Sequence, residues 1–135
     1  MTLGKACIYA GGALTLLVAV FHTRFYRLFR WEKPLQAMGF PNKSIFYTIH
    51  IALLLLFFLV AFLSFRYAGE LEAGTGLALG LVAGLALFWL WRAVWQITYF
   101  SEARGPMHAG LTACFFLLAA CYAVPAVMAL RKMLS

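Results

Sequence analysis

"GTGLALGLVAGLALFWLWRAVWQITYF" (residues 74–100) contains no acidic residue and a single basic residue, Arg92. A helix needs about 20 mostly apolar residues to cross the ~30 Å hydrocarbon core of a bilayer, and this stretch is long enough. Three other stretches of the chain have the same apolar character. We therefore predict transmembrane helices over residues 6–26, 44–65, 75–98 and 109–130.

The composition indicates the same class of protein. Of the 135 residues, 65% are hydrophobic and 11% are charged, whereas a soluble domain has roughly 45–50% apolar and about 25% charged residues. A soluble domain of this length leaves too much surface exposed to hide so many apolar side chains. No lasting alternation of polar and apolar residues indicates strands. The expected fold is an all-α integral membrane protein with one domain over residues 1–135.

The connections between the apolar stretches are short, which makes consecutive helices antiparallel neighbours. An up-down-up-down bundle is the simplest arrangement of this kind. Its orientation follows from the Lys and Arg residues near the helix ends, since these residues prefer the cytoplasmic side. Seven lie on one side and four on the other. The larger group is Arg24, Arg27, Arg30, Lys33, Lys43, Arg92 and Arg104, and the smaller one is Lys5, Arg66, Arg131 and Lys132. We expect both termini outside, in a bacterial inner membrane.

The segment after the first predicted helix, "FHTRFYRLFRWEKP" (residues 21–34), has basic and aromatic residues in helical spacing. On a helix its arginines share one side and its apolar residues the other, which predicts a short amphipathic extension at the membrane interface. The predicted contacts with anionic lipid headgroups are Arg24, Arg27, Arg30 and Trp31. We expect Pro34 to prevent further regular helix and Ser44 to cap the second long helix.

Several polar residues are expected at one level of the membrane, in its cytoplasmic half. Ionisable residues within a membrane are costly and need a reason. The candidate ligand-binding residues are His22, His50, Arg92, Gln96, Trp95 and Tyr47. Histidine also binds metals and haem iron, so the metal candidates are His22, His50 and His108. The alternative interpretation is that these histidines only make interfacial or interhelical hydrogen bonds.

Gly76, Gly80 and Gly84 form a G-x-x-x-G-x-x-x-G stripe in the third helix. Such stripes allow another helix to approach closely, so we expect this half of the helix to be tightly packed. The other half carries bulky tryptophans, which favours a cavity near the cytoplasmic interface. Alternatively, the tryptophans form an ordinary interfacial belt and Arg92 extends to the lipid phosphates.

No catalytic motif such as H-E-x-x-H or G-x-S-x-G is present. All four acidic residues lie outside the predicted spans, which argues against a proton- or cation-coupled transporter. The formal net charge is +7. Because the positive residues flank apolar spans, anionic lipids are the expected partners rather than nucleic acid.

Three functions stay open at this point. The first is a non-enzymatic bundle, alone or in a larger complex, that binds a lipid, a quinone or haem in its cytoplasmic half. The second is a membrane enzyme acting on a lipid-like substrate, with histidines as acid–base or metal groups. The third is a homo-oligomeric channel with the glycines of the third helix at the contact between protomers. The sequence favours the first.

Overall fold

The computed structural model describes residues 1–100 and 105–135, and this part of the chain is helical without strands. Arg104, one of the basic residues counted for the orientation, and Glu102, one of the four acidic residues, lie outside the described residues. The helices are α1 (Leu3–His22), α2 (Phe25–Leu28), α3 (Glu32–Ala37), α4 (Phe40–Arg66), α5 (Ala68–Ala73), α6 (Leu77–Tyr99) and α7 (Pro106–Leu134). Of these, α1, α4, α6 and α7 are long and apolar enough to cross a membrane. The prediction of an all-α chain with four such helices is confirmed.

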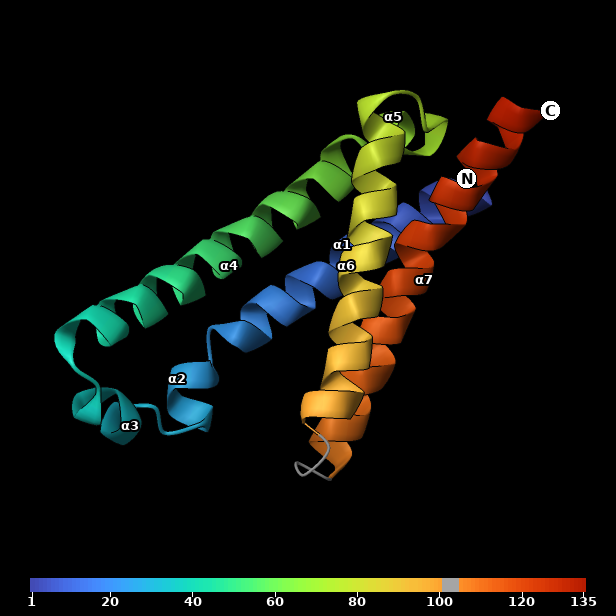
Figure 1. The fold of residues 1–135 in the computed structure, drawn as a ribbon. Helices are drawn as coiled ribbons and strands as arrows, with labels where there is room; N and C mark the ends of the chain where they lie inside the picture. Colours follow the sequence, from blue (N-terminus) through green and yellow to red (C-terminus); the bar gives the residue numbers. More distant parts are fainter. Residues whose placement is uncertain (101–104) are drawn as a thin grey trace.

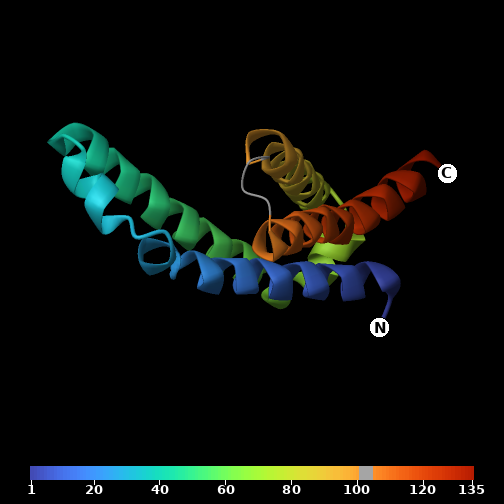
Figure 2. The same cartoon turned by 90° about the horizontal axis from the view of Figure 1, so that it is seen from below.

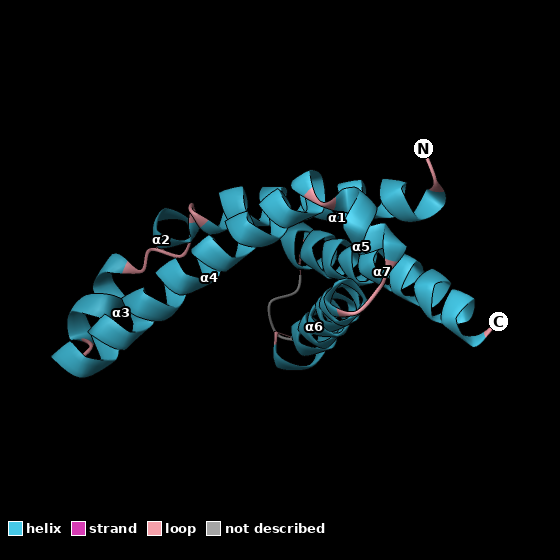
Figure 3. Cartoon of the chain, turned by 90° about the horizontal axis from the view of Figure 1, so that it is seen from above, coloured by secondary structure: helices cyan, strands magenta, loops and turns pink. Residues whose placement is uncertain are grey.

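The long helices form two antiparallel pairs, α1 with α4 and α6 with α7, and α1 also packs on α7 (Figure 1). The first half of α4 extends away from α6 and α7 together with α2 and α3 (Figures 1 and 2). Helix α5 lies where α1, α4, α6 and α7 meet (Figure 3). A side-chain contact links α4 to α6, since the Phe57 ring stacks on Trp89 at 5.4 Å. The closed up-down-up-down bundle is not confirmed by this arrangement.

Two adjacent glycines of α1 lie at its crossing with α4 and α7. A Cβ atom on Gly11 would lie 2.9 Å from the Tyr122 ring, and one on Gly12 would lie 2.8 Å from Cβ of Ser64. Ser64 and Tyr122 are fully buried, and their hydroxyl groups are 2.9 Å apart in a hydrogen bond between α4 and α7. Because Gly11 and Gly12 have no side chains, α1 can approach both α4 and α7 closely.

The glycine stripe of α6 does not have the role within the chain that its spacing predicted. Gly76, Gly80 and Gly84 are exposed, and a Cβ on any of them would meet nothing within 4 Å. The buried face of α6 is formed by Val82, Trp89, Ala93 and Gln96. A step of four residues turns about 400° around a helix, so the stripe drifts about 40° per step relative to a fixed face. A contact between Gly80 and a second copy of the chain stays a prediction.

Three of the differences between the helix boundaries and the sequence expectations have an identifiable cause. Helix α4 begins at Phe40 rather than at Ser44, because Pro41 lies in its first turn, where no backbone donor is needed. Pro34 lies in the first turn of α3 for the same reason, so it does not prevent helix there. The stretch 23–31 is not one helix, because α1 ends at His22 and Arg30 adopts a left-handed φ of 49°.

The turn at Arg30 ends α2 with a common type of C-terminal helix cap. The N–H of Trp31 donates to the carbonyl of Tyr26 at 3.1 Å, and the N–H of Arg30 donates to that of Arg27 at 3.3 Å. This pair of bonds, with a left-handed residue between, is a Schellman motif. It redirects the chain from α2 into α3 and turns Trp31 toward α4. There the centre of the Trp31 ring lies 4.8 Å from the centre of the Phe46 ring.

At the other end of the molecule, a carboxylate of α5 caps α1. Glu72 accepts hydrogen bonds from the Thr2 hydroxyl and, at 3.2 Å, from the backbone N–H of Lys5. The first N–H groups of a helix have no partner within the helix, so a side chain from another element satisfies one here.

We expect Glu72→Ala to lower the free energy of unfolding by about 1 kcal/mol, the usual cost of losing a helix cap. The measurement is denaturation of the purified protein in mixed detergent micelles. Glu70→Ala is the matched control, since Glu70 lies two residues away on α5 and is exposed. Equal effects of the two substitutions would contradict a capping role for Glu72.

Candidate functional site

Four buried polar atoms lack a hydrogen-bond partner in the part of the chain that the structure describes. They are Nε2 of His22, Nε1 of Trp89, Nη1 of Arg92 and Oε1 of Gln96. Most buried polar groups in native proteins are hydrogen-bonded, and each exception calls for an explanation. All four residues line one or both of two adjoining cavities, and this coincidence marks the candidate site.

The first cavity, here called the aromatic chamber, has a volume of about 400 Å³. Its walls are mainly aromatic and aliphatic side chains of α1, α4, α6 and α7. The second, here called the histidine chamber, has a volume of about 350 Å³ and includes His22 and His108. Both chambers share five lining residues, which are His22, Phe25, Arg92, Phe100 and Leu111. We therefore treat them as one cavity with two chambers.

Arg92 is the cation of this cavity. Its guanidinium carbon lies 4.5 Å from the centre of the Phe115 ring and 5.4 Å from that of Phe100. Such contacts stabilise a cation through the electron-rich ring faces. None of the described residues that line either chamber is acidic. The guanidinium is thus held by aromatic rings while Nη1 stays without an acceptor.

Trp89 is the centre of a stack of three rings. It is 1% exposed, and its ring lies nearly parallel to Phe57 at 5.4 Å and to Phe115 at 5.7 Å. These rings come from α4, α6 and α7, so the stack ties the two helix pairs together. The stacking leaves the indole N–H, which can only donate, without an acceptor.

The three histidines have different surroundings. The rings of His22 and His50 stack at 4.5 Å with an angle of 22° between their planes. His50 also contacts Trp31 at 5.3 Å and does not line either chamber. His108 lines the histidine chamber, and its Nε2 is 3.0 Å from the backbone carbonyl of Gln96, which joins α7 to α6.

The structure brings some of the predicted ligand-binding residues together and leaves others apart. His22, Arg92, Gln96 and Trp95 line the cavity. His50 stacks on His22 without lining the cavity itself, and Tyr47 also lies outside both chambers. Trp95 stacks on Tyr99 at 3.8 Å.

Trp89 was expected only as one of the bulky tryptophans of the third helix and not as a ligand-binding residue, and His108 was expected only as a metal candidate. The sequence does contain a signal for Trp89. Val82, Trp89, Ala93 and Gln96 follow one another at intervals of seven, four and three residues, which places them on the same side of a helix. The signal for His108 was its level, which matches that of Gln96 on the neighbouring antiparallel helix.

The residues predicted to contact lipid headgroups divide into two groups. Arg24, Arg27 and Arg30 are exposed, as headgroup contacts require. Trp31 is half-buried, with its ring against Phe25, Phe29, Phe46 and His50. Its place is explained by packing within the protein, and headgroup contacts of the three arginines stay a prediction.

The geometry does not favour a metal site. Within residues 1–100 and 105–135, no three side chains of the types His, Cys, Asp or Glu converge in a way that could hold a metal ion. His22 and His50 stack with their ring centres 4.5 Å apart, and no third side chain of these types joins them among the described residues. His108 is engaged by the Gln96 carbonyl. Binding of a metal or haem stays a hypothesis from the sequence.

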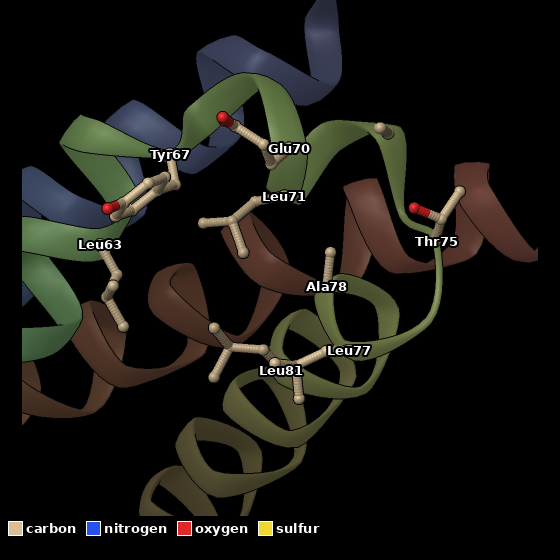
Figure 4. Close-up of a pocket in the computed structure, with 9 residues that line it drawn as sticks. Leu63, Tyr67, Glu70, Leu71, Thr75, Leu77, Ala78 and Leu81 are labelled. Carbon is tan, nitrogen blue, oxygen red and sulfur yellow. The ribbon is translucent and has the colours of Figure 1, made fainter.

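Another cavity, of about 390 Å³, lies where α4, α5 and α6 meet (Figure 4). Leu63, Leu71 and Leu81 form part of its wall, and Tyr67 and Glu70 are its larger polar side chains. None of the four buried polar atoms without a partner belongs to its lining. It therefore lacks the feature that distinguishes the two-chambered cavity.

Within the described ranges, 1–100 and 105–135, the chain is all-helical and has four helices long and apolar enough to span a membrane. No family model, no curated protein and no solved structure matches the chain. Its function is therefore argued from its own residues.

Proposed function

We propose that the protein is a non-enzymatic membrane protein that binds an amphiphilic small molecule in the two-chambered cavity. The observation that carries this proposal is that the four residues with a buried polar atom that lacks a partner all line this cavity. A bound molecule with a polar end would supply the missing hydrogen bonds, and each such bond stabilises the complex because the unpaired atoms are costly. Its apolar part would fill the aromatic chamber.

The size and lining of the cavity support binding of a small molecule. Ligand pockets are typically about 300–1,000 Å³ and mostly apolar, with a few polar groups that fix the orientation of the ligand. The chambers, of about 400 and 350 Å³, fall in this range. Binding is favoured over catalysis because, among the described lining residues, no carboxylate lies beside a histidine, the usual arrangement that activates one.

We place the cavity in the cytoplasmic half of a bacterial inner membrane, with both termini outside. The support for this orientation is the distribution of Lys and Arg, seven residues against four. Phospholipid headgroups contacting Arg24, Arg27 and Arg30 would hold α2 at the interface, as expected for an amphipathic segment.

Leu111 offers a direct test, since its side chain lines both chambers. We expect Leu111→Trp to fill the cavity and to abolish the thermal stabilisation that added amphiphiles give the wild type. At a ligand concentration of about 100 times Kd, that stabilisation is about 2.7 kcal/mol. The measurement is the melting temperature of the protein in a neutral detergent with a fatty acid, a short-tailed quinone or a phospholipid.

Leu117→Trp is the matched control, because Leu117 lies on the same helix and is 54% exposed. This variant should respond to amphiphiles as the wild type does. An unchanged response of Leu111→Trp, or a wild type that none of the amphiphiles stabilises, would count against the proposal. A visible absorption spectrum with a Soret band would identify haem as the ligand instead.

A further inference from the structure

We infer that the polar end of the ligand is an anion, a carboxylate or a phosphate, bound by Arg92 and Trp89. This inference rests on the proposed function and specifies the chemical class of its ligand. Its starting point is the charge of the cavity, to which Arg92 contributes a permanent cation and the described lining residues no acid.

The described acidic residues lie elsewhere. Glu32 is exposed on α3, and Glu70 and Glu72 lie on α5, where Glu72 caps the first turn of α1 at the opposite end of that helix from His22. A charge in apolar surroundings is costly unless it is paired. The contacts with Phe100 and Phe115 offset part of this cost, and an anionic ligand would offset the remainder.

The hydrogen-bonding groups favour the same class of ligand. Arg92 and Trp89 can only donate, and they leave Nη1 and Nε1 without acceptors. Both side chains contact the Phe115 ring, and they are three residues apart on one helix, which makes them neighbours on the surface of α6. A carboxylate or phosphate presents several acceptor oxygens and matches the planar guanidinium group.

The position of Arg92 also orients the ligand. Arg92 lines both chambers, whereas Val18, Leu53 and Phe57 line only the aromatic chamber. A headgroup at Arg92 therefore places an apolar tail among these side chains, and His22 and Gln96 lie within the same lining to complete the contacts of the headgroup.

The test compares four probes with the same tail and different headgroups: dodecanoate, dodecyl phosphate, dodecanol and dodecyltrimethylammonium. Binding to the whole chain in a neutral maltoside detergent is measured by titration calorimetry, and the number of bound molecules by native mass spectrometry. We expect at least one anion to bind about tenfold or more tightly than the alcohol, since each tenfold is about 1.4 kcal/mol and one charge-assisted bond supplies that. The tighter of the two anions identifies the headgroup.

Two variants locate the effect. Arg92→Gln should reduce the affinity for the anion to that of the alcohol. Trp89→Phe keeps an aromatic ring in the stack and removes the donor, so it should weaken binding of the anion several-fold and leave binding of the alcohol unchanged. Arg131→Gln, which removes the same charge from an exposed position near the end of α7, should change neither.

The outcomes separate this inference from the function on which it rests. Equal affinity for the alcohol and the anions would contradict the inference that the headgroup is an anion, but not the proposal that an amphiphile binds in the cavity. An equal loss in Arg131→Gln and Arg92→Gln would also overturn it, because the preference would then come from surface charge. If no probe binds, the proposed function fails together with the inference. Should Arg92→Gln not fold, the result with Trp89→Phe decides.

Discussion

Gly12→Leu should lower the free energy of unfolding by about 3 kcal/mol, the upper end of the usual cost of overpacking. Already the first atom of a new side chain would lie 2.8 Å from Cβ of Ser64, closer than side chains approach one another. The helices would have to move apart, which would also break the hydrogen bond between Ser64 and Tyr122. Denaturation in mixed detergent micelles, followed by circular dichroism, measures the effect.

Gly80→Leu is the control for this prediction, because a Cβ atom on Gly80 would meet nothing within 4 Å. We expect its stability to stay within about 0.5 kcal/mol of the wild type, as for surface substitutions. A loss equal to that of Gly12→Leu would contradict the packing described here. A change in elution volume with unchanged stability would instead indicate that Gly80 lies in a contact between copies of the chain.

Trp89→Ala should cost about 3 kcal/mol, the lower end of the range for truncating a buried aromatic residue. The lower end is expected because the unfolded helices remain in detergent or lipid, so the transfer of apolar surface from water contributes little. What is lost is the packing of the indole between Phe57 and Phe115, which leaves a void at the junction of α4, α6 and α7.

Trp91→Ala is the matched control, since Trp91 lies two residues away and is 52% exposed. It should cost well under 1 kcal/mol in the same denaturation experiment, as for other exposed positions. Trp89→Phe should cost less than about 1.5 kcal/mol, because it preserves a ring in the stack. Similar losses for Trp89→Ala and Trp91→Ala would show that the stack does not hold the helix pairs together.

The number and rough position of the long helices were predictable from the sequence. Each apolar run, such as residues 74–100, is long enough to cross the hydrocarbon core, and only a helix satisfies its own backbone hydrogen bonds there. The end positions were less predictable. Pro34 and Pro41 fall in first turns of helices, where proline is tolerated, and the sequence does not show whether a proline begins a helix or ends one.

Part of the candidate site was predictable because polar residues in apolar helices are few. Counting residues from the helix ends put His22, Arg92 and Gln96 at one level, and all three line the cavity. The sequence did not show that Trp89 is buried, since a buried tryptophan and an exposed one look alike in an apolar run. The difference between Trp89 and Trp91 is their direction on α6, which depends on where α7 and α4 lie.

Amino-acid sequence alone determined the class of fold, because chain composition and run length decide whether segments are helices in lipid. Only the tertiary structure decided which faces meet: Gly11 and Gly12 contact other helices, Gly80 does not, and the first half of α4 diverges from α6. The physical reason is that lipid tails are as apolar as the side chains between helices. In a soluble protein a hydrophobic stripe marks the buried face, whereas in these helices both faces are apolar, so shape rather than polarity selects the contacts.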